Sequence, residues 1–84
     1  MNAESAYKLG LAILVGTTID RNVLIEAYTL FKIAYGISNK QEYFTCAKNM
    51  ERLLNEIEIQ SATKDSETRL KQMTGTNSNI EPIK

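Results

Sequence analysis

The side chains best suited to chemistry are tyrosines with cations close to them in the sequence. Tyr7 and Tyr28 share the first 38 residues with three cations, Lys8, Arg21 and Lys32. An aromatic ring beside a cation can stack a nucleobase and neutralise its phosphate. These five residues are therefore a candidate site for a small nucleotide. The alternative, which is commoner, is that the tyrosine rings line a core and keep their hydroxyl groups at its rim.

The residues needed for catalysis or for metal binding are sparse. The chain has no histidine, which is the usual general base and metal ligand. Cys46 is the single cysteine, and we interpret it as structural because no partner base accompanies it. Glu56 and Glu58 would point to different faces of a helix, and Glu51 lies one heptad before Glu58 on a face that we expect to be solvated. We predict no enzymatic activity, no metal site and no cofactor.

Length and charge narrow the class of protein. Eighty-four residues, of which 43% are hydrophobic, make one small domain. The hydrophobic core of a domain this small rarely contributes more than ~3–5 kcal/mol to the free energy of unfolding. One cysteine cannot form an internal disulfide, so tight helix packing or self-association must add stability. Ten basic and ten acidic residues give a net charge of zero. This balance provides no long-range attraction to duplex nucleic acid or to an anionic membrane, and it does little to prevent self-association.

The longest apolar run does not predict a membrane segment. Residues 9–15 fall far short of the ~20 apolar residues that span a bilayer. A signal peptide is not indicated either, because Glu4 offsets Lys8 ahead of the run and no small-residue cleavage site follows at Gly16. The single thiol, Cys46, suits a reducing compartment. We expect a cytoplasmic protein.

Three helices are predicted to position these residues, because Pro82 is the only proline and nothing earlier forbids helix. Gly16 and Gly36 each follow an apolar run and predict the ends of the first two helices. The predicted helices cover about residues 3–15, 20–35 and 39–62. The N-cap candidates are Asn2, then Thr18 or Asp20, then Ser38 or Asn39, the last two with Gln41 and Glu42 as capping-box partners.

The second and third predicted helices differ in their apolar pattern. The second is apolar over most of its circumference and should be buried on more than one side. The third carries a stripe with coiled-coil spacing, which Phe44 and Leu53 widen. The stripe consists of Tyr43, Ala47, Met50, Leu54 and Ile57. On the outer face of this helix, Arg52 and Glu56 are placed to pair at i, i+4. Three helices can hardly cover the second one completely, so we expect a neighbouring subunit or a partner protein to cover it. The residues expected at that junction are Leu24, Tyr28, Phe31, Tyr35, Met50 and Leu54.

The last part of the sequence has a different composition. Residues 63–84 contain no aromatic and few aliphatic residues, which is typical of a flexible segment. A short turn of helix over 67–73 is the one element expected there. The predicted fold is therefore all-α. It comprises a helical domain over residues 1–62, made of a helical hairpin and a longer closing helix, and a flexible polar tail over 63–84.

Small and aromatic residues recur at set positions in the first two predicted helices. The positions are Ala6, Leu9, Gly10, Gly16, Ala27, Phe31 and Ala34. Gly10 and Ala27 would let the two helices approach closely, with Phe31 wedged between them. The pattern resembles one Sel-like repeat, a helix–turn–helix unit related to the tetratricopeptide repeat. The chain departs from that repeat at Thr18 and Ile13, and no complete second unit follows. The resemblance implies an all-α scaffold for protein interaction.

Three hypotheses about function follow from these features. The first is a non-enzymatic interaction protein that assembles with itself, with a partner protein or with both, and whose oligomer Leu54→Asp would abolish. The alternative is an oligomer that binds or sequesters a small nucleotide at its subunit junctions, through the five residues of the candidate nucleotide site. The third is an adaptor or inhibitor whose tail folds on a target protein. The Asn-, Ile- and Lys-rich composition would suit a protein of a phage or mobile element.

Overall fold

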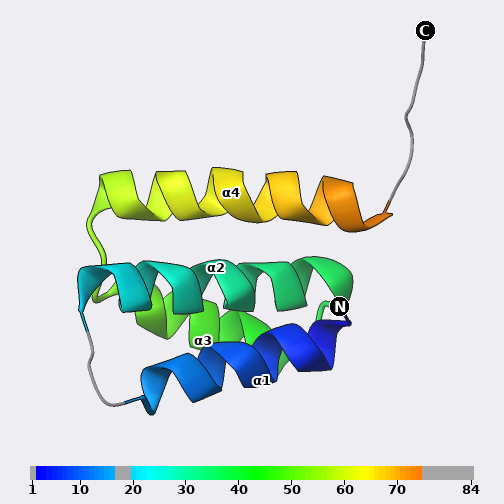
Figure 1. The fold of residues 1–84 in the computed structure, drawn as a ribbon, viewed down its shortest axis with the longest axis horizontal. Coiled ribbons are helices and arrows are strands. Elements are labelled where there is room, and N and C mark those ends of the chain that lie inside the picture. The colour runs from blue at the N-terminus through cyan, green and yellow to red at the C-terminus, as the bar shows by residue number, and fades with distance from the viewer. Residues whose placement is uncertain (1, 17–19, 75–84) are drawn as a thin grey trace, which may run out of the picture.

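The structure is a computed structural model that describes residues 2–16 and 20–74. These residues form four helices, α1 (Ala3–Leu14), α2 (Arg21–Ile37), α3 (Gln41–Glu51) and α4 (Glu56–Thr74), and no strand. Successive helices run in opposite directions, and α2 lies between α1 and α4 (Figure 1). The predicted all-α class is confirmed, whereas the prediction of three helices is wrong.

The central helix is α2, which packs against each of the other three helices. Its buried residues are Ala27, Tyr28, Thr29, Leu30, Phe31, Ile33 and Ala34. The prediction that this segment is buried on more than one side is therefore confirmed. Within the described residues, α4 provides a cover for α2 that the three predicted helices could not.

Close packing joins α1 to α2 at a glycine. A Cβ atom on Gly10 would lie 2.8 Å from Cε1 of Phe31, so only glycine lets the ring approach the α1 backbone this closely. Both helices begin at predicted N-caps. The Ser5 N–H donates to Oδ1 of Asn2 at 2.7 Å, and the Val23 N–H donates to Oδ1 of Asp20 at 2.9 Å.

The predicted continuous helix over 39–62 is broken in the structure. After Glu51 the chain tightens into a turn in which the Leu53 N–H donates to the Met50 carbonyl at 2.9 Å. Asn55 then caps α4, because its Oδ1 accepts from the Glu58 N–H at 2.8 Å while the Glu58 carboxylate accepts from the Asn55 N–H at 2.9 Å. This reciprocal capping box satisfies the first donors of a new helix, and it explains why the chain starts one here.

Two other predicted boundaries also differ from the structure. The N-cap of α3 is Lys40, which makes no side-chain cap bond, so the predicted caps Ser38 and Asn39 are wrong. Gly36 does not end α2, which continues to Ile37. The structure gives this glycine another role, since a Cβ there would lie 2.6 Å from Cδ1 of Leu70 on α4.

The helix α4 crosses the predicted limit between a helical domain and a tail at residue 62. It continues to Thr74, and residues 75–84 of the predicted tail lie outside the described residues. Its fully buried residues are small, Ala62 and Ser66, while Ile59 and Leu70 are half-buried against the core clusters. The turn of helix predicted over 67–73 is confirmed as part of α4. A prediction from composition misses the rest of this helix, because its second half contains few large apolar residues.

Candidate functional site

One end of the bundle brings all four helices together. There α1 and α3 end while α2 and α4 begin (Figure 1). Arg21, the first residue of α2, reaches the turn between α3 and α4. Its Nε donates to Oε2 of Glu58 at 3.0 Å, its Nη2 donates to the other carboxylate oxygen, and its Nη1 donates to the Leu53 carbonyl at 3.1 Å. A single guanidinium thus fixes both the turn and the start of α4.

Arg21 and Glu58 stabilise each other's charged form. The hydrogen bonds from Arg21, together with that from the Asn55 N–H, keep the pKa of Glu58 below its ordinary value. The same pairing raises the pKa of Arg21. Both groups are therefore charged at neutral pH, and an anionic ligand at Arg21 would have to displace a two-point carboxylate contact.

The most exposed large apolar side chains of the described residues lie at this same end. Val15, which follows α1, is 83% exposed, Ile57 in the first turn of α4 is 77% exposed, and Leu53 in the α3–α4 turn is 52% exposed. The other exposed large apolar side chains are between 37% and 44% exposed. Val15 stands apart from the other two, because α2 lies between α1 and α4 (Figure 1). We call Leu53 and Ile57, which lie on either side of the break between α3 and α4, the apolar end.

Two charges of opposite sign are the sequence neighbours of Leu53 and Ile57. Arg52 directly precedes Leu53, and Glu56 directly precedes Ile57. The predicted i, i+4 pair between these two charges does not form, because the helix breaks between them. Both residues are exposed, and neither side chain forms a hydrogen bond or an ion pair with the described part of the chain.

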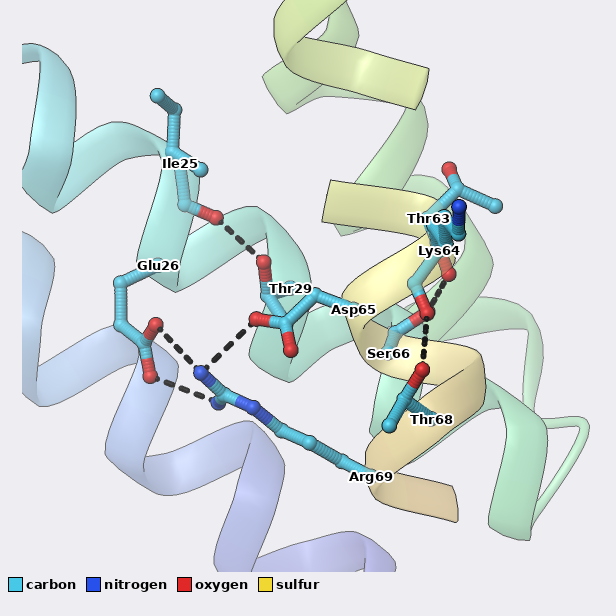
Figure 2. A network of polar contacts seen from close by, with 9 residues as sticks. All are labelled: Ile25, Glu26, Thr29, Thr63, Lys64, Asp65, Ser66, Thr68 and Arg69. Carbon is cyan, nitrogen blue, oxygen red and sulfur yellow. Dashed lines mark hydrogen bonds and ion pairs between the residues drawn. The ribbon is translucent and has the colours of Figure 1, made fainter. Parts of the chain in front are cut away.

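A polar network joins α2 to α4 away from the apolar end (Figure 2). The Arg69 guanidinium donates to both carboxylate oxygens of Glu26, at 2.9 and 3.2 Å, and it pairs with Asp65 at 3.0 Å. The pairing with Glu26 raises the pKa of Arg69. The buried hydroxyls of Thr29 and Ser66 each donate to a carbonyl of their own helix. Every group of the network that we describe has a partner, so we assign the network to the docking of α4.

The structure places most of the predicted junction residues inside the chain. Tyr28, Phe31, Met50 and Leu54 pack in one core cluster, where each is at most 8% exposed. Leu24 is half-buried against the same cluster, and Tyr35 is half-buried against a second cluster. Because the chain's own helices cover the first four, Leu24 and Tyr35 are the two of the six that offer surface to another molecule.

The predicted nucleotide residues do not converge. Lys8 pairs with Glu4 on its own helix at 3.1 Å, whereas Arg21 is held by Glu58. Of the five residues, Tyr28 and Lys32 are brought together, with the Lys32 Nζ atom 5.9 Å from the ring centroid of Tyr28. The cations are therefore divided between α1, the bundle end and the middle of α2.

The tyrosines belong to the core and its rim. The ring of Tyr7 lies 4.9 Å from that of Tyr43 between centroids, and its hydroxyl accepts a weak hydrogen bond from the Cys46 thiol at 3.9 Å. The hydroxyl of Tyr28 donates to the Glu51 carboxylate at 2.8 Å. Burial, together with this bond, raises the pKa of Tyr28 to about 12. Although burial opposes its charge, Glu51 has a lowered pKa because of its bonds with Tyr28 and Lys48.

No protein-family model, curated protein or solved structure matches the chain. Among the described helices, none is both long and apolar enough to cross a membrane. Over the same residues, no three acidic or cysteine side chains gather in a way that could hold a metal ion.

Sequence reasoning missed the residues of the apolar end as site candidates. It placed Ile57 on the buried stripe of a continuous helix and assigned Leu53 to the edge of that stripe. The signal that could have corrected this is the spacing of Asn55 and Glu58, which fits a capping box and so marks the start of a helix. Once the break is placed at Asn55, the apolar residues on either side of it no longer share one stripe.

Proposed function

We propose that this chain is a small non-enzymatic interaction protein, which assembles with itself or with a partner protein through its apolar end. The observation that carries the proposal is the exposure of Leu53 and Ile57, two of the three most exposed large apolar side chains of the described residues, on either side of the break between α3 and α4. The removal of apolar surface from water is favourable by roughly 25 cal/mol of free energy per Å². Exposed apolar groups that lie together mark sites of interaction more often than single ones do.

The fold has no need of large apolar side chains at these positions. Ile57 occupies the first turn of α4, where a polar residue would serve the helix as well, since isoleucine is only a moderate helix former. Leu53 lies in a turn that Arg21 holds through the carbonyl group, not through the side chain. A role in contacting another molecule accounts for both residues.

The apolar end is also held in a fixed shape. Arg21 joins the start of α2 to Leu53 and Glu58, and the Asn55 capping box fixes the first turn of α4. A surface that is ordered before binding loses less conformational entropy on association. We include a reducing compartment such as the cytoplasm in the proposal, because the half-buried Cys46 is a free thiol.

Site-specific photocrosslinking tests the proposal directly. The photoreactive amino acid benzoylphenylalanine replaces Ile57 in the full chain, and the matched control places it at Glu67, an exposed residue of α4. In cells, or in the purified chain at up to millimolar concentration, position 57 should give one defined product and position 67 should not. Mass spectrometry identifies the product as the chain itself or as another protein.

A second measurement separates a specific product from a chance neighbour. The purified chain should bind the identified partner, and Ile57→Asp should weaken that binding at least tenfold while leaving the melting temperature unchanged. Equal crosslinking from positions 57 and 67, or binding that Ile57→Asp does not affect, would refute the proposed function.

A further inference from the structure

The charge pattern around the apolar end is complementary to itself. Arg52 and Glu56 are of opposite sign, are exposed, and lack a side-chain partner among the described residues. In a two-fold contact, residue i of one copy faces residue j of the other, and the reverse holds at the same time. One pair of opposite charges beside an apolar surface therefore becomes two ion pairs when two copies meet.

We propose that the apolar end binds a second copy of this chain about a two-fold axis, with Arg52 of each copy facing Glu56 of the other. This inference rests on the proposed function and names its partner. Leu53 and Ile57 of the two copies cover each other at the centre of the contact. Arg52 and Glu56 lie at its rim, where their pairing sets the orientation of the two copies.

Net charge favours a second copy over a strongly charged partner. The chain has ten basic and ten acidic residues, so two copies do not repel each other at long range. At the end of the bundle where the apolar end lies, Arg52 and Glu56 stand beside Asp20 and the Arg21–Glu58 pair, so charges of both signs are present. A mixed pattern of this kind suits an inverted copy of itself better than a partner of one charge.

The size of the contact predicts a weak dimer. Four residues a side, Arg52, Leu53, Glu56 and Ile57, fall well below the ~20–30 residues a side of a standard stable interface. We therefore expect a reversible dimer whose population rises with concentration from micromolar to millimolar, not a permanent one.

Charge reversal tests the pairing on the full chain by sedimentation velocity over that range of concentration. Arg52→Glu and Glu56→Arg, each alone, place like charges in both contacts and should raise the dimer dissociation constant about tenfold. The double variant exchanges the two charges and should restore the dissociation constant to within about twofold of the parent value. Lys64→Glu, which makes the same charge change at an exposed position of α4, should leave it unchanged.

Thermal unfolding is measured for each variant, because Glu56 also lies in the first turn of α4, where a negative charge favours the helix. The dissociation constant of a variant is compared with that of the parent chain only where the two melting temperatures agree. If Glu56→Arg lowers the melting temperature, Glu56→Gln is measured instead. Glu56→Gln should weaken the dimer by a smaller factor, since it removes the attraction without adding repulsion.

The outcomes separate this inference from the function on which it rests. A parent chain that stays monomeric up to millimolar concentration, or a dimer that the reversals leave unchanged, overturns pairing with a second copy. If position 57 then still crosslinks to another identified protein, the interaction function holds with a different partner. If it crosslinks to nothing, both the pairing and the interaction function fail.

Discussion

Gly10 lies directly under the ring of Phe31, at a distance that leaves no room for a methyl group. A Cβ on Gly10 would be 2.8 Å from Cε1 of the ring and 3.2 Å from Cδ1. The ring is 1% exposed in the core, so it has little freedom to move away. Gly36 has a similar relation to Leu70, but there the close atom is the terminal methyl of a half-buried, flexible side chain.

This difference predicts opposite effects of the same substitution. Gly10→Ala gains up to ~1 kcal/mol of helix propensity, but overpacking against a fixed ring costs ~1–3 kcal/mol, so it should lower the free energy of unfolding by about 1 kcal/mol. Gly36→Ala gains the same propensity, and Leu70 can rotate away, so stability should be unchanged or higher. Urea unfolding measures both, and a Gly10→Ala variant more stable than the parent chain would contradict the close packing.

The core around this contact is the part of the fold that the sequence predicts best. Asn2 and Asp20 have the residue types and positions of N-caps, and the structure confirms both. Gly10 and Ala27 were predicted to let the first two helices approach closely with Phe31 between them, and the structure places the Phe31 ring against Gly10. The caps depend on residues near one another in sequence, and small residues on a helical face mark where another helix can approach, so a single sequence carries this information.

The hydroxyl of Tyr28 predicts a loss of stability at high pH. Burial and the bond with Glu51 raise its pKa from 10.0 to about 12, so the folded state keeps the proton at a pH where the unfolded state releases it. The stabilisation is fully present below pH 10, and it is lost as the pH rises from about 10 to about 12. A change of this size corresponds to roughly 2–3 kcal/mol.

Tyr28→Phe provides the measurement. The variant lacks the hydroxyl, so the difference in unfolding free energy between parent and variant should shrink between about pH 10 and about 12. Tyr7→Phe is a useful comparison, because the pKa of Tyr7 is also raised, first through its bond with Cys46. A difference between parent and Tyr28→Phe that stays constant over this range would show that the Tyr28 hydroxyl titrates normally in the folded chain.

The capping box at the start of α4 predicts that the loss of an asparagine side chain lowers the free energy of unfolding at Asn55 but not at other exposed positions. Asn55→Ala removes the acceptor of the Glu58 N–H and should lower the free energy of unfolding by about 1 kcal/mol. Asn49→Ala makes the same chemical change at an exposed position inside α3, where alanine is the better helix former, and should cost nothing. Equal effects at the two positions would mean that Asn55 does not act as a cap.

The break at Asn55 and the length of α4 are the parts of the fold that were mispredicted. The stripe over Tyr43, Met50, Leu54 and Ile57 is compatible with one long helix, and local periodicity cannot report that a capping box interrupts it. The helix α4 packs through the small residues Ala62 and Ser66, through the half-buried Ile59 and Leu70, and through the ion pair between Arg69 and Glu26 of α2. The partners of this face are distant in sequence and few of its residues are large and apolar, so neither the helix nor the apolar end at its start was predicted.

The network of Arg69 predicts salt-dependent docking of α4. Arg69→Met keeps most of the side-chain length but removes the two bonds to Glu26 and the pair with Asp65. Because both carboxylates are partly exposed, the loss should be about 1 kcal/mol at low salt and less at high salt. Amide hydrogen exchange should quicken in α4 more than in α1.

Lys64→Met is the control for this experiment. It removes the same charge from an exposed position of the same helix, where no ion pair with the described residues is found, and it should leave exchange in α4 unchanged. If Arg69→Met and Lys64→Met accelerate exchange equally, the effect comes from net charge and not from the network.

The neighbouring residues Leu53 and Leu54 separate folding from association. Leu54 is 8% exposed in the core, so Leu54→Asp would bury a charge and should prevent stable folding instead of reporting on an oligomer, as the sequence had suggested. Leu53 is 52% exposed, so Leu53→Asp should keep the parent melting temperature and weaken association at the apolar end. Circular dichroism gives the melting temperature and sedimentation velocity gives the association. A folded Leu54→Asp variant, or an unfolded Leu53→Asp variant, would show that the turn between α3 and α4 is placed in the wrong register.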